Sequence, residues 1–88
     1  MTEIGLDPND LRAAALKFEE AGKSFQTTLE NLDKSTADLK NKWSGASQQV
    51  FYKQYEEMHG FMESLTALSE NIAREMQAMA DHIEKIDH

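Results

Sequence analysis

The sequence predicts an all-α fold, an antiparallel helical hairpin that dimerises into a four-helix bundle. Helix-breaking residues are scarce, with one proline and four glycines in 88 residues, and only Gly45 lies among other turn-forming residues. On both sides of Gly45, apolar residues recur at alternating steps of three and four, which is the spacing of helices packed in coiled-coil fashion. A single domain of this size has a marginal core of its own, so a partner chain would stabilise it.

The first helix is expected at about residues 8–42. Asp7 can cap its amino end, Pro8 suits the first helical position, and Asp10 places a carboxylate near the positive end of the helix dipole. The positions expected to face the second helix are Leu11, Ala15, Phe18, Gly22, Phe25, Leu29, Leu32, Thr36, Leu39 and Trp43.

A Trp-Ser-Gly turn at 43–45 follows. Glycine accepts the left-handed backbone that ends a helix, and serine or glycine can cap the next one. We therefore expect Trp43, Ser44 and Gly45 to form the tip of the hairpin.

The second helix is expected at about residues 46–86, with a seam of the same period. Folding at the turn pairs positions whose numbers sum to about 90, so Gly22 is expected opposite Ser69, where the backbones come close. The alternative is that Gly22 is merely tolerated. The seam positions are Phe51, Tyr55, Met58, Met62, Leu65, Ser69, Ile72, Met76, Met79, Ile83 and Ile86.

The two sides of the seam differ in character. One side is small on the first helix, at Ala14 and Ala21, and carries two large apolar residues on the second, Phe61 and Leu68. Because two helices cannot enclose a core, these four residues are the predicted dimer interface. The other side is expected to be mostly solvated and consists of Arg12, Glu19, Gln26, Asp33 and Lys40 with Tyr52, His59, Thr66, Ala73 and Ala80.

Composition argues against several classes of function. The net charge of −7 would repel nucleic acid and anionic lipid. No run approaches the ~18 apolar residues of a membrane span, so direct membrane insertion is not expected, and the first ten residues lack the pattern of a cleavable signal peptide.

Residues for chemistry are also scarce. There is no cysteine, the histidines at 59, 82 and 88 have no partner histidine one helical turn away, and no glycine-rich phosphate loop occurs. We expect no catalytic residues, no metal site, no cofactor and no enzymatic activity.

The combination of a helix, the sequence WSG at residues 43–45, a second helix, an acidic balance and no signal peptide resembles the WXG family of small ESAT-type proteins of type VII secretion systems. The resemblance covers nearly the whole chain, and Trp43 and Gly45 carry over as its motif residues. It implies a helical hairpin that forms homodimeric or heterodimeric four-helix bundles. It also implies secretion without a cleavable signal peptide.

The family's export pattern does not occur at its usual position in this chain. Members with a known export signal often carry Tyr-x-x-x-Asp/Glu beyond the second helix, whereas this chain ends with "HIEKIDH". The literal match, Tyr52 with Glu56, falls near the start of the second helix. There we interpret the two residues as ordinary neighbours on a helix surface.

Two functions follow as hypotheses. The first is a substrate or co-substrate exported by a type VII machine, as a homodimer or as a heterodimer with a related WXG protein, with a secretion ATPase as transient partner. The second is a non-exported adaptor that binds the helical amino-terminal region of a larger toxin. Trp43 is interpreted either as part of a surface that the ATPase recognises or as a plug at the end of the bundle.

Overall fold

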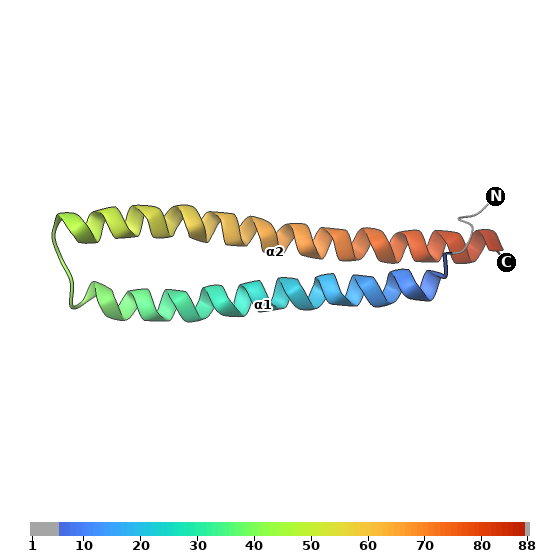
Figure 1. The fold of residues 1–88 in the computed structure, drawn as a ribbon, viewed down its shortest axis with the longest axis horizontal. Helices are drawn as coiled ribbons and strands as arrows, with labels where there is room; N and C mark the ends of the chain where they lie inside the picture. Colours follow the sequence, from blue (N-terminus) through green and yellow to red (C-terminus); the bar gives the residue numbers. More distant parts are fainter. Residues whose placement is uncertain (1–5, 88) are drawn as a thin grey trace.

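The computed structural model describes residues 6–87, which form two antiparallel helices joined by a short turn (Figure 1). Helix α1 spans Pro8–Lys40 and helix α2 spans Ala46–Asp87. No strand occurs in the described part of the chain. The predicted all-α hairpin is confirmed.

The hairpin is a rod. Its extents are 65 × 17 × 16 Å and its radius of gyration is 19.7 Å, whereas a compact domain of this length has a radius of about 12 Å. Within residues 6–87, no helix is both long enough and apolar enough to cross a membrane.

Helix α1 begins with a side-chain cap. Asp7 is extended at φ −86°, and its carboxylate accepts a hydrogen bond from the backbone N–H of Asn9 at 2.9 Å. Pro8 occupies the first turn, where its missing N–H costs nothing.

The helix ends two residues before the expected position 42. The N–H groups of Asn41 and Lys42 bond to the carbonyls three residues earlier, Asp38 and Leu39. This tightened turn closes α1 at Lys40.

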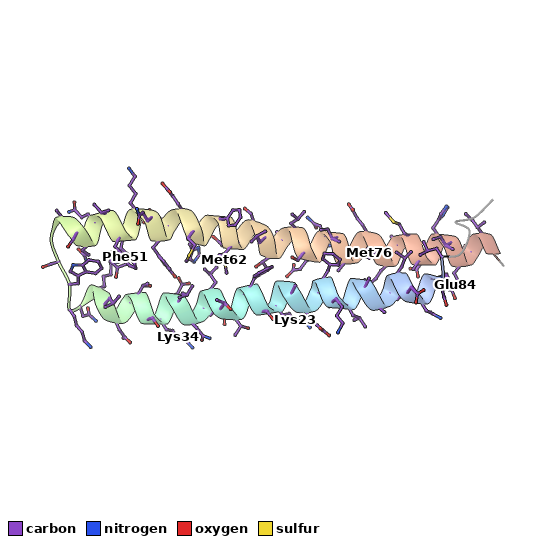
Figure 2. The ribbon with its side chains drawn as sticks, viewed as in Figure 1. Lys23, Lys34, Phe51, Met62, Met76 and Glu84 are labelled. Atoms are coloured by element: carbon purple, nitrogen blue, oxygen red, sulfur yellow. The ribbon has the colours of Figure 1, made fainter. Side chains whose placement is uncertain are left out.

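Small residues make much of the contact between the helices. The positions buried on α1 recur every seven residues, and no large side chain in the described chain is fully buried. Figure 2 shows Phe51 and Met62 directed from α2 toward α1, while Lys34 points outward. The buried residues are Ala15, Gly22, Leu29 and Thr36 on α1 with Ser69, Ala73, Ala80 and Ile83 on α2.

The seam of α2 is rotated relative to the expectation. Ala73 and Ala80, placed by the sequence pattern on a mostly solvated side, are 4% and 0% exposed. Met58 and Met79, expected in the seam, are 39% and 54% exposed. The predicted solvated side was therefore wrong for α2, because small alanines allow closer helix contact than methionines do.

The register agrees with a turn-centred pairing. A Cβ atom added at Gly22 would lie 3.6 Å from Cβ of Ser69 and 3.5 Å from the carbonyl oxygen of Thr66. Gly22 thus lies against Ser69, and the spacing is that of ordinary van der Waals contact.

Candidate functional site

The tip of the hairpin is an aromatic cluster around Trp43. The indole is half-buried, its centroid lies 5.3 Å from that of Phe51, and its Nε1–H donates a hydrogen bond to Ser47 Oγ at 3.0 Å. Phe51 in turn stacks on Tyr55 at 6.1 Å. Trp43 therefore closes the end of the seam and still presents part of its ring to solvent.

Gly45 turns the chain into α2. Its φ is +106°, the one positive φ in residues 6–87, and its carbonyl accepts the N–H of Gln49 at 3.3 Å. A Cβ atom here would meet nothing within 4 Å. The requirement for glycine is therefore conformational. Ser44 beside it is exposed.

Tyr52 is a half-buried residue that contacts α1. Its hydroxyl donates to the carbonyl oxygen of Thr36 at 2.6 Å, and Lys40 Nζ lies 5.7 Å from the ring centroid. Glu56, its partner in the Tyr-x-x-x-Glu pattern, is exposed. Glu56 thus lies on the helix surface as expected, whereas Tyr52 is half-buried and joins α2 to α1.

Charge is segregated along the rod. Residues 39–55 contain Lys40, Lys42 and Lys53 and no carboxylate. All 16 Asp and Glu lie outside this stretch, together with the other six of the nine Lys and Arg. The tip is positive on a molecule that is otherwise strongly negative.

An apolar face runs along one side of the hairpin. Phe61 and Leu68 are 63% and 55% exposed, and Ala14 and Ala21 on α1 are half-buried. Heptad position places the other exposed seam residues on the same side. We define the apolar face as Ala14, Phe18, Ala21, Leu39, Met58, Phe61, Leu68, Met79 and Ile86.

A depression adjoins the apolar face at Met79, near the open end of the hairpin. An open depression of about 330 Å³ is lined by Leu6, Leu11, Ala78, Met79, His82 and Ile83. Since most of these residues are apolar, the depression suits an apolar side chain from a second molecule.

The opposite side holds a polar cluster that the sequence analysis did not single out. His59 lies between Asp33 of α1 and Glu63 of α2, and the hydroxyl of Tyr55 donates to Asp33. The hydrogen bond to Asp33 raises the pKa of His59, and the bond from Tyr55 lowers the pKa of Asp33. We call these four residues the His59 cluster.

A second polar link joins the helices near their open end. Arg12 of α1 donates to Asp81 at 2.8 Å and also to Glu84, both of α2. Arg12, Asp33 and His59 all belong to the side that the heptad pattern had grouped together. The heptad pattern thus showed that these residues share a side. It did not show that α2 is rotated so that this side turns toward α1.

Among residues 6–87, no group of three or more His, Asp and Glu is placed to hold a metal ion. His88 lies outside the described residues. The candidate site is thus a set of surfaces, namely the tip and the apolar face.

Comparison with known proteins agrees with the hairpin fold. Residues 3–88 match the family described as "WXG100: Proteins of 100 residues with WXG". The chain belongs to the WXG100 family. The Trp-x-Gly for which WXG100 proteins are named corresponds here to Trp43, Ser44 and Gly45 at the tip.

Other WXG100-like proteins match over almost their full length. Protein YukE of Bacillus subtilis (strain 168) is 26% identical over 84 residues, covering 96% of this chain and 87% of that protein. The type VII secretion system extracellular protein A of Staphylococcus aureus (strain USA300) is 21% identical over 87 residues, covering 99% and 90%. The secreted protein EsxB of Bacillus anthracis str. Sterne superimposes with a TM-score of 0.86 at 25% identity, covering 100% of both chains.

Proposed function

We propose that this WXG100 protein is a small, non-enzymatic substrate or co-substrate of a type VII secretion system. The observation that carries the proposal is the match of nearly the whole chain to proteins named as secreted or extracellular, on the same hairpin fold. The protein leaves the cytoplasm by that machine. Its role there is protein binding, through the tip and the apolar face.

The partner on the apolar face is a second copy of the chain. Large apolar side chains lie exposed along it, and a 65 × 17 Å side of the rod is comparable with the roughly 800 Å² per partner of a standard interface. In a symmetric pair each molecule contributes the same face, so Phe61 and Leu68 pack on Ala14 and Ala21 of the other hairpin. A related WXG100 protein with a similar face is the alternative partner.

Charge favours an antiparallel pair. An antiparallel arrangement places the positive tip of one hairpin beside the open end of the other, which carries Asp7, Asp10, Asp81 and Glu84. A parallel arrangement places tip beside tip and acidic end beside acidic end, which repels. The antiparallel pair also brings the apolar depression at the open end opposite the tip.

Trp43 is the proposed recognition residue for the secretion ATPase. In the antiparallel pair its exposed ring face and the end of the partner's second helix form one composite surface. Partly exposed tryptophans are common anchors of interfaces. Ser44, exposed on the same tip, and Gly45, which has open space around it, allow another protein to approach closely.

The test is export of Trp43→Ala from cells with an intact type VII system. We expect the variant to fold and dimerise, to accumulate inside the cell, and to be lost from the culture supernatant. Ser47→Ala is the matched control, because it removes the hydrogen bond to the indole and leaves the indole itself in place. That control should be exported normally.

Three outcomes separate the alternatives. Normal export of Trp43→Ala would overturn the recognition role. Loss of thermal stability together with low intracellular levels would assign Trp43 to plugging the bundle end. Retention of the unaltered protein inside the cell, bound to a larger toxin, would favour the adaptor function over export.

A further inference from the structure

The side of the hairpin opposite the apolar face holds an open groove between the helices. Its volume is about 400 Å³. Carboxylates dominate its lining, and none of the described lining residues is Lys or Arg. The lining consists of Gln26, Leu29, Glu30, Asp33, His59, Glu63, Thr66, Ala67 and Glu70.

His59 bridges the two helices at this groove with both of its ring nitrogens. Nδ1 lies 3.0 Å from Oε1 of Glu63 on its own helix, and Nε2 lies 3.2 Å from Oδ2 of Asp33 on α1. Ionised carboxylates only accept hydrogen bonds, and a neutral imidazole has a single N–H to donate. Both contacts are hydrogen bonds at once only when the ring is the doubly protonated imidazolium.

The surroundings favour that charged form. From α1, Asp33 and Glu30 face the groove, and from α2, Glu63 and Glu70 do so. The hydroxyl of Tyr55 donates to Asp33, so Asp33 stays ionised and in place beside the ring. The hydrogen bonds to Asp33 and Glu63 outweigh partial burial and raise the pKa of His59 above its ordinary value of 6.5.

We propose that the His59 cluster is a proton-operated latch between the helices. Protonated His59 ties Asp33 of α1 to Glu63 of α2 across the groove. Loss of the proton removes one of the two hydrogen bonds of the ring and the charge attraction. The hydrogen bond from Tyr55 to Asp33 then carries more of the link between the helices, which gain freedom to separate there. The latch does not depend on export, and it lies away from the apolar face, so it operates in the dimer as well.

The two pKa shifts define the pH range of the latch. Because the pKa of His59 is raised on folding, its stabilising effect is complete below its unfolded value of about 6.5 and is lost as the pH rises through the folded value. Because the pKa of Asp33 is lowered on folding, its effect is present above about 3.8 and is lost as the pH falls through the folded value. The latch is therefore closed from about pH 4 to at least about pH 6.5, and it opens as the pH rises through the raised pKa of His59.

The first experiment is an NMR titration of the histidine ring protons in the full chain. We expect the His59 midpoint to lie above its ordinary value of 6.5. Asp33→Asn removes the carboxylate beside Nε2 and should move that midpoint down. A His59 midpoint at or below 6.5, or one that ignores Asp33→Asn, would overturn the latch.

The second experiment measures opening directly. The chain has no cysteine, so spin labels attach only at introduced cysteines, and Gln26→Cys with Ala67→Cys places one label on each wall of the groove. We expect a shorter, narrower distance distribution at pH 5.5 than at pH 8, as measured by double electron–electron resonance.

Two variants in the labelled background complete the design. His59→Gln should give the broad distribution at both pH values, whereas His82→Gln should keep the pH response. Circular dichroism at each pH verifies that the variants are helical. Identical distributions at pH 5.5 and 8 in the parent, or a pH response that survives His59→Gln, would contradict the proposal.

Discussion

At the scale of single residues, two glycines of this chain have opposite roles. Gly45 holds φ at +106°, a conformation that side-chain-bearing residues rarely adopt, in open space. Gly60 lies inside α2, also with nothing near its Cβ position. Backbone conformation alone therefore distinguishes the two.

Alanine substitutions at Gly45 and Gly60 should change the stability in opposite directions. Gly45→Ala should lower the free energy of unfolding by more than about 1 kcal/mol, because the strained φ remains. Gly60→Ala should raise it by up to about 1 kcal/mol, because alanine is the better helix former. Thermal unfolding followed by circular dichroism measures both, and a Gly45→Ala melting temperature equal to that of the parent would remove the case for a strained turn.

The residues that cap a helix or form the turn were predictable because their chemistry is local. Asp7 and Pro8 begin a helix, and Gly45 ends the turn, through interactions within a few positions of themselves. His59 was not predictable as a functional residue, because its role depends on Asp33, 26 positions away. Whether the His59 side chain points toward solvent or toward α1 depends on how α2 is rotated against α1.

At the scale of the helices, Tyr52 is the side chain that ties the start of α2 to α1. Its hydroxyl donates to the carbonyl oxygen of Thr36, a buried residue of the seam. A hydrogen bond of this kind contributes about 1 kcal/mol net. Tyr52 therefore has a structural task whatever the origin of the Tyr-x-x-x-Glu pattern.

Removing the Tyr52 hydroxyl tests whether its hydrogen bond to Thr36 stabilises the hairpin. Tyr52→Phe should lower the melting temperature by about 4–8 °C, the shift that 1 kcal/mol produces in a domain of this size. Glu56→Gln is the control and should leave it nearly unchanged, since Glu56 is exposed. If the two variants melt alike, the contact between Tyr52 and Thr36 does not stabilise the hairpin.

The heptad pattern predicted both helices and their register but misplaced part of the seam on α2. Large apolar residues such as Met79 were assigned to the contact between the helices, and small ones such as Ala80 to solvent. The structure has the reverse, with Met79 54% and Ala80 0% exposed. A hairpin that forms a bundle has two contact faces, one between its own helices and one toward the partner molecule. A single sequence does not tell which apolar residues belong to which face.

At the scale of the whole molecule, the rod leaves several large apolar side chains exposed. The contact between α1 and α2 is made largely by small residues, while Phe61, Leu68 and Met79 are each more than half exposed. Exposed apolar area of this extent marks a protein–protein interface. We therefore propose that the hairpin assembles through the apolar face.

The most direct measurement is sedimentation equilibrium at micromolar concentration on the parent, Phe61→Glu and Leu16→Glu. Leu16 is 54% exposed but lies off the apolar face, so its variant controls for the added charge. We predict dimers for the parent and Leu16→Glu. Phe61→Glu should be a folded monomer, with affinity lowered more than about 100-fold by the unpaired carboxylate at the interface. A parent protein that sediments as a monomer, or a Phe61→Glu variant that dimerises like Leu16→Glu, would contradict the account.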